Sequence, residues 1–268
     1  MEYIWISVLS AAVSAAEIAV AYRIRNCQKT CVVLATLFAL YALTAKTVEF
    51  ASYRINGIAQ YPVEFSHVSY FVLGAVALSG IKVLRPFASF CALLTGTGYL
   101  IALMLSPQSM ATGFRSTGYF LHSVFVHNCL FAGGLLFMLG GDRFRYKNFY
   151  ISLAGFICIL GFADLVRAGV IYKDITYKDD IILLKIMDGR ILEYVVDPQS
   201  LTPALKGIAV AAIFVAVVAL MALIYFISNK VCDKRLKKRG ETPPFKTDFG
   251  LVPLAVKIYG RVKARTNI

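Results

Sequence analysis

The stretch Gln60–Phe71 reads QYPVEFSHVSYF and opens an apolar run that continues to Leu84. Proline suits the first turn of a helix, where its missing N–H group has no helical partner to lose. The stretch therefore predicts the mouth of a membrane-spanning helix. Its polar side chains are Glu64, Ser66, His67, Ser69 and Tyr70. Because polar groups are costly in lipid, such a cluster usually faces the inside of a helix bundle and marks a functional site.

The composition extends this interpretation to the whole chain. The protein has 268 residues, of which 59% are hydrophobic, and a mean hydropathy of +0.69. Several windows of roughly 20 apolar residues are long enough to cross a bilayer. The first window follows Met1 and Glu2 without a basic leader or a small-residue cleavage site, so we expect a retained helix and no signal peptide.

We therefore expect an all-α polytopic membrane protein with a bundle of seven transmembrane helices. The expected spans cover residues 3–22, 30–53, 62–84, 86–105, 117–139, 148–172 and 203–228. Residues 1–228 would form the transmembrane domain, with a non-cytoplasmic loop over 173–202, and residues 229–268 would form a basic cytoplasmic tail.

The distribution of Lys and Arg predicts the orientation. The connections after the first, third, fifth and seventh spans are basic, whereas those after the second and fourth hold only Arg54 and Arg115 near their ends. The connection after the sixth span is mixed and rich in Asp. The positive-inside rule therefore places the N-terminus outside and the C-terminus in the cytoplasm of a cell-membrane protein.

Two segments outside the spans allow more than one interpretation. The connection after the sixth span is either a hairpin around Asp188-Gly189, since Asp-Gly is a turn signal, or an interfacial helix. The tail Phe249–Ile268 mixes apolar and basic residues, which is typical of a segment on the inner leaflet but also of a disordered positive tail.

The charge and the cysteines narrow the expected partners. Much of the net charge of +13 follows Lys230, and a basic run beside a membrane helix indicates anionic inner-leaflet lipid rather than nucleic acid. The six cysteines form no CxxC pair, and three of them lie inside apolar runs. We expect no disulfide framework, no zinc and no cofactor, and the sequence identifies no protein partner.

With this topology, titratable residues of four spans fall at similar depth, in the outer half of the bilayer. They are Lys46, Glu49, Glu64, His67, His122, His127, Asp164 and Arg167, whereas Glu17 lies in the inner half. We expect the eight residues of the outer half to converge in one cavity that opens away from the cytoplasm. The three-residue spacing of Lys46 with Glu49 and of Asp164 with Arg167 puts each pair on one helix face. Such pairs are either working groups or neutralised pairs that only join helices.

This set of residues would support acyl transfer. A hydroxyl nucleophile needs a base, and the base needs an orienting partner. Ser66 would be the nucleophile and His127 the base, with Glu49, Glu64 or Asp164 orienting the imidazole. Arg167 or Lys46 would hold a phosphate or carboxylate headgroup.

Short motifs resemble those of a known family. Residues 61–69 (YPVEFSHVS) stand where the YwaF-like integral membrane family has a pattern of the type L-P-L-E-L-C-x-x-S. His127 precedes the basic loop 140–147 by about a dozen residues, as a family histidine does, and Asp164 followed by residues 169–172 is a loose counterpart of the end of the sixth span. The chain is also distantly similar to transmembrane acyltransferases and androgen-induced-gene-type lipid hydrolases.

The resemblance implies a bundle built around a nucleophile and a histidine that act on lipid. Two positions depart from the family pattern, because Ser66 replaces a reactive cysteine and Asp164 replaces an asparagine. Serine depends wholly on its base, whereas cysteine is intrinsically the better nucleophile near neutral pH.

Two hypotheses about function follow. The first is a membrane-embedded lipid acyltransferase or ester hydrolase with Ser66 and His127 as its pair. The second is a non-enzymatic transporter or a bundle that binds lipid or a small molecule. A retinal photoreceptor is excluded because the last span has only Lys206, at its edge, and an ion channel is disfavoured because there is no pore loop or repeated charged ring.

Overall fold

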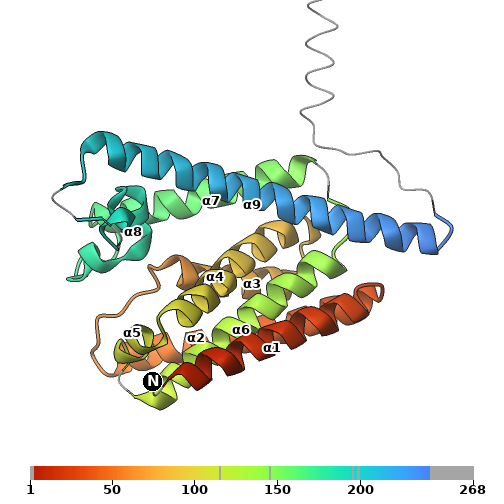
Figure 1. The fold of residues 1–268 in the computed structure, drawn as a ribbon, viewed down its shortest axis with the longest axis horizontal. Helices are drawn as coiled ribbons and strands as arrows, with labels where there is room; N and C mark the ends of the chain where they lie inside the picture. Colours follow the sequence, from red (N-terminus) through yellow and green to blue (C-terminus); the bar gives the residue numbers. More distant parts are fainter. Residues whose placement is uncertain (1–2, 115, 145, 195, 198–199, 242–268) are drawn as a thin grey trace, which may run out of the picture.

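The chain is helical throughout the part that the structure describes. The computed structural model describes residues 3–241 apart from 115, 145, 195 and 198–199, and these residues form helices joined by turns (Figure 1). The α-helices are α1 (Ile4–Ile24), α2 (Gln28–Ile55), α3 (Phe65–Ser79), α4 (Arg85–Leu105), α5 (Pro107–Thr112), α6 (Thr117–Gly140), α7 (Tyr146–Arg167), α8 (Ile182–Met187) and α9 (Pro203–Lys238). The predicted inner-leaflet segment Phe249–Ile268 lies outside the described residues.

Within the described residues, six helices are long and apolar enough to cross a membrane, which indicates a membrane protein. They are α1, α2, α4 with the 3-10 turn before it, α6, α7 and α9. The helix of the expected third span, α3, has only 15 residues, and so measures about 22 Å against a hydrocarbon core of about 30 Å. It ends early because Gly80 adopts a left-handed conformation, with φ of 65°, and caps the helix.

Helix α6 is the centre of the bundle. Of its most apolar window, 83% is buried inside the molecule, against 22% for the corresponding window of α1. It packs most extensively against α2 and α4. A helix that is apolar on all sides is expected to be covered on all sides, and the neighbouring helices supply that cover.

The other long helices surround this centre. Figure 1 shows α1, α2 and α6 on one side of the molecule and α7 with α9 on the other. Both α7 and α9 contact α4, and α9 also contacts α6. Helix α9 continues ten residues beyond the predicted end of the seventh span, so the boundary expected at residue 228 falls inside an unbroken helix.

The long connection after α7 folds into short helices over one end of the bundle. Residues Asp188-Gly189 turn between α8 and a 3-10 helix, Arg190–Tyr194, so the hairpin alternative is wrong for the described residues. Gly189 has φ of 69°, and a side chain there would meet the Lys206 backbone at 2.5 Å. The connection is therefore tied to the start of α9.

Before α3, the chain is held against this connection by aromatic and polar contacts. The Tyr61 ring stacks on Tyr172 at 4.4 Å between centroids, and the Tyr61 N–H donates to the Tyr177 hydroxyl at 2.9 Å. The Tyr61 hydroxyl also donates to Asp174, and this hydrogen bond holds the pKa of the carboxyl below its usual range. These contacts fix the entrance of α3.

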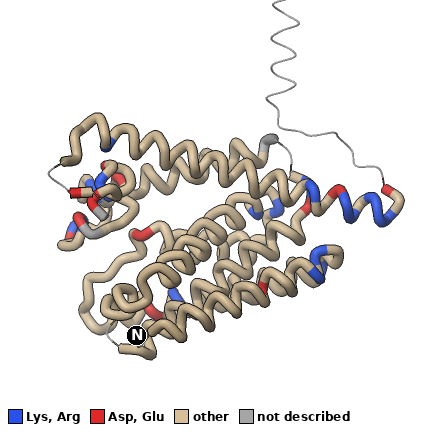
Figure 2. Tube along the Cα trace, viewed as in Figure 1, with Lys and Arg blue, Asp and Glu red and all other residues tan. Residues whose placement is uncertain are grey.

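Charged residues separate toward the two ends of the molecule. Figure 2 shows Lys and Arg gathered where α1 and α9 end, with fewer Asp and Glu among them, whereas the end that carries α8 mixes both signs of charge. The last turn of α9 contains Arg235, Lys237 and Lys238.

The contact between α4 and α6 generates a testable prediction. A Cβ atom added at Gly96 would lie 2.9 Å from the Phe131 backbone, whereas one added at Gly98, on the same helix, meets nothing within 4 Å. We expect Gly96→Ala to destabilise the protein by about 1–3 kcal/mol, because the α6 backbone must shift. Thermal unfolding in detergent measures this, and Gly98→Ala is the matched control. Equal midpoints for the two variants would contradict close packing of α4 on α6.

Candidate functional site

A buried ion pair on α2 is the first part of the candidate site. Lys46 Nζ lies 2.8 Å from Glu49 Oε2, and the two side chains are 6% and 23% exposed. Their three-residue spacing on the helix brings them together. A lysine at this depth requires a counter-charge, since an unpaired ammonium is very costly in an apolar interior.

Glu49 connects this ion pair to an open groove. Its Oε1 accepts a hydrogen bond from the Tyr53 hydroxyl at 3.2 Å. Glu49 and Tyr53 also line a groove of about 430 Å³ between α2 and α6, together with His122. The remaining lining residues are Tyr41, Thr44, Ala45, Val48, Ser52 and Tyr119. The groove therefore combines apolar walls with hydroxyl, carboxylate and imidazole groups.

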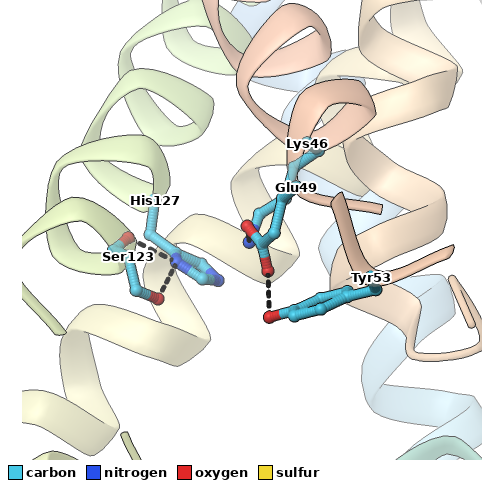
Figure 3. A network of polar contacts seen from close by, with 5 residues as sticks. All are labelled: Lys46, Glu49, Tyr53, Ser123 and His127. Atoms are coloured by element: carbon cyan, nitrogen blue, oxygen red, sulfur yellow. Dashed lines mark hydrogen bonds and ion pairs between the residues drawn. The ribbon is translucent and has the colours of Figure 1, made fainter. Parts of the chain in front are cut away.

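Across from the ion pair, His127 is buried on α6. Figure 3 shows the side chains of His127 and Glu49 pointing toward one another from α6 and α2. The imidazole stacks on the Tyr99 ring of α4 at 3.6 Å, and its Nδ1 lies 2.8 Å from the Ser123 carbonyl oxygen. A carbonyl oxygen only accepts, so Nδ1 carries the proton and, in the neutral ring, Nε2 presents the lone pair.

Tyr70 of α3 joins the two halves of the site. Lys46 Nζ lies 5.2 Å from the centre of its ring, and the ring meets His127 edge-on at 5.5 Å. The hydroxyl of Tyr70 is buried and has no hydrogen-bond partner among the described residues. Such a group in an apolar interior marks a place where a polar ligand atom would find a donor or an acceptor.

The predicted nucleophile does not pair with His127. Ser66 lies half-buried in the first turn of α3, while the hydrogen bonds of His127 within the described chain go to Ser123. The role of Ser66 as a nucleophile therefore stays a prediction.

Glu64 and His67 have a structural explanation. They form a capping box at the start of α3, in which the Glu64 N–H donates to His67 Nδ1 at 3.4 Å. Glu64 Oε1 also accepts from the Ile182 N–H, at the start of α8. His67 packs edge-on against Phe50 of α2, with ring centres 5.0 Å apart. These two residues order the entrance to α3 beside the polar site.

The charged pair of α7 lies apart from the other predicted residues. Asp164 and Arg167 are 60% and 41% exposed, and they lie 3.7 Å apart. Arg167 makes its shorter contact, 2.8 Å, with Asp188 after α8. Four helices are expected to bring their polar residues together. The structure does so for residues of α2, α3 and α6. The charged pair of α7 instead contacts the connection that follows α7 at the surface.

Sequence reasoning overlooked Tyr53 and Tyr99. Tyr53 stands four residues after Glu49, so its spacing was a usable signal. Tyr99 lies in the apolar α4, and only the packing of α4 against α6 brings it onto His127.

The described residues show no group of three or more His, Cys, Asp or Glu side chains placed to hold a metal ion. All six cysteines are free thiols, and four of them, Cys31, Cys91, Cys129 and Cys232, are buried.

Comparisons with protein-family models, curated proteins and solved structures find no match for this chain.

The two charged pairs at the same spacing allow a matched test. We expect Glu49→Gln to destabilise the protein by roughly 3–5 kcal/mol, because it leaves the Lys46 ammonium buried without a counter-charge. Asp164→Asn removes an exposed carboxylate and is expected to cost less than about 1 kcal/mol. Chemical unfolding in detergent measures both free energies.

A double variant separates lost pairing from general damage. Lys46→Met combined with Glu49→Gln removes the stranded charge, so its stability should recover part of the loss. Equal costs for Glu49→Gln and Asp164→Asn would contradict a buried, interdependent pair on α2.

Proposed function

We propose that the chain is a seven-span protein of the cell membrane, with its N-terminus outside and its C-terminus in the cytoplasm. Six long apolar helices support this, and α3, a shorter apolar helix that packs between α2 and α4, would be the seventh span. The gathering of Lys and Arg at the end where α1 and α9 finish supports the orientation (Figure 2). Exposed Lys237 and Lys238, in the last turn of α9, would meet anionic lipid of the inner leaflet there.

For the function itself, we propose that the protein binds a lipid in the groove between α2 and α6. The observation that carries this proposal is the composition of the groove, in which Val48 and Ala45 provide apolar wall and Glu49, Tyr53 and His122 provide polar groups. Ligand sites in proteins characteristically combine apolar walls with a few placed polar groups. An acyl chain would lie against the apolar wall, and a lipid headgroup would lie against the polar groups.

The charge of the groove favours a neutral hydrogen-bonding headgroup, such as an ester or a glycerol hydroxyl. Lys46 already balances Glu49, so no net charge from this pair faces a ligand. The His122 imidazole lines the groove as a polar partner, beside the Tyr53 hydroxyl that donates to Glu49. A series of contacts links the groove to the buried side chains. Glu49 pairs with Lys46, Lys46 lies over the Tyr70 ring, and that ring contacts His127.

Filling the groove tests this proposal. Val48 lines the groove and is 63% exposed, whereas Val33 is 58% exposed on the same helix but does not line it. We expect Val48→Trp to reduce the copurifying lipid, measured by native mass spectrometry, by about tenfold, because the indole occupies ligand space. Val33→Trp should retain the wild-type amount. Equal lipid content in all three proteins would refute binding in this groove.

A second candidate function is acyl transfer or ester hydrolysis by Ser66 and His127, which the short motif resemblances to transmembrane acyltransferases and lipid hydrolases suggest. The Ser123 carbonyl favours it, because it holds the proton on Nδ1 and leaves Nε2 as the basic nitrogen. This function requires α3 to bring the Ser66 hydroxyl within hydrogen-bond reach of Nε2, directly or through one water.

A fluorophosphonate probe distinguishes the two candidates. Catalysis predicts labelling at Ser66 that is lost in Ser66→Ala and His127→Ala, because the hydroxyl depends on its base. Ser79→Ala, at the exposed end of α3, and His122→Ala serve as controls and should keep the label. Peptide mass spectrometry locates the adduct. Lipid recovered intact from an unlabelled protein would leave binding as the function and exclude the serine nucleophile.

A further inference from the structure

A second cavity lies at the opposite end of the bundle from α8. It has a volume of about 240 Å³ and is bordered by the start of α2, the turn between α6 and α7, and the last turns of α9. Three arginines line it, namely Arg143, Arg235 and Arg239. Neither the lipid groove nor the buried histidine site shares any of these residues.

Arg235 is the innermost of the three. It is only 5% exposed, and its Nη2 donates to the Gly141 carbonyl oxygen at 2.7 Å. Its Nη1 is buried and has no hydrogen-bond partner among the described residues. A guanidinium offers five N–H donors in a fixed fork, and one carbonyl oxygen does not satisfy them. Arg235 therefore retains donor capacity at the wall of the cavity.

The neighbouring charges leave the cavity positive. Asp233 accepts from Arg143 Nε at 2.9 Å, so this carboxylate is engaged. Asp142 accepts from the Gln28 side-chain amide at 2.7 Å and lies 3.5 Å from Lys82. Among the described residues that line the cavity, three are arginines and one, Asp142, is a carboxylate that already has partners. The excess positive charge favours an anion.

The start of α2 adds to this preference. Gln28, the first residue of α2, lines the cavity. The N-terminal end of a helix carries partial positive charge and exposed N–H groups, which favour phosphate. Arg239 lines the cavity as an exposed side chain with no polar contact in the described chain.

We propose that this cavity binds a phosphate group, held by Arg235 and Arg239 beside the start of α2. The planar donor fork of arginine matches the oxygen atoms of phosphate, and charge-assisted hydrogen bonds of this kind are strong. The phosphate belongs either to the headgroup of an anionic phospholipid or to a free phosphate ion. The site is independent of the proposed lipid groove between α2 and α6.

Two probes test the site and distinguish the sources. Protein in phosphatidylcholine nanodiscs is titrated with inorganic phosphate by isothermal calorimetry. Protein from nanodiscs with and without phosphatidylglycerol is then analysed for bound lipid by native mass spectrometry. The variants are Arg235→Gln and Arg239→Gln, with Lys234→Gln as the control, because Lys234 is exposed on the same helix and does not line the cavity.

We expect one of the probes to bind and each arginine variant to weaken it about tenfold, as for the loss of a charged hydrogen bond. Lys234→Gln should bind as the wild type does. Retention of phosphatidylglycerol identifies a lipid headgroup, and a response to inorganic phosphate identifies the free ion. If Arg235→Gln does not fold, Arg239→Gln decides, since its side chain has no polar contact in the described chain to lose. Failure of both probes, or equal loss in Lys234→Gln, overturns the proposal.

Discussion

The close packing of α4 and α2 onto α6 is the contact on which the rest of the structure depends. At Gly96 and Gly134 the helix backbones approach so closely that an added Cβ atom would lie under 3 Å from its neighbour. Because α6 is buried along most of its length, its side chains meet those of both partners. That closeness stacks the Tyr99 ring on His127 and encloses the imidazole.

The candidate site follows from this packing and from the cost of charge in an apolar interior. Lys46 on α2 faces the enclosed histidine and is stabilised by Glu49 one turn away. Glu49 has a second role, since it also borders the groove through which the interior meets the surface. A lipid headgroup in the groove would therefore contact a residue that is already part of a buried polar network.

The two ends of the molecule differ in charge and in construction. At one end, α8 and its neighbouring turns cover the entrance of α3, held by Glu64 and by the Tyr61–Asp174 hydrogen bond. At the other, α9 extends past the bundle and fastens the turn after α6 through Asn229 and Arg235. Part of the basic run of α9 is thus used inside the protein, while its lysines remain exposed.

The sequence by itself determined the helical class and the approximate limits of most spans, because long apolar runs bounded by basic residues have few other structures available in lipid. It also identified the Lys46–Glu49 pair, since a three-residue spacing brings side chains together on any helix. The orientation and the count of seven spans remain proposals.

Only the tertiary structure decided which polar residues meet. Depth along a helix is readable from the sequence, but the direction that each face points depends on how neighbouring helices pack. Thus Asp164 and Arg167 share the expected depth with Lys46 yet face the surface connection, while Tyr99, in an apolar stretch, lies against His127. The pattern of apolar residues also did not predict how short α3 is. The apolar run continues past Gly80, whose left-handed conformation ends the helix.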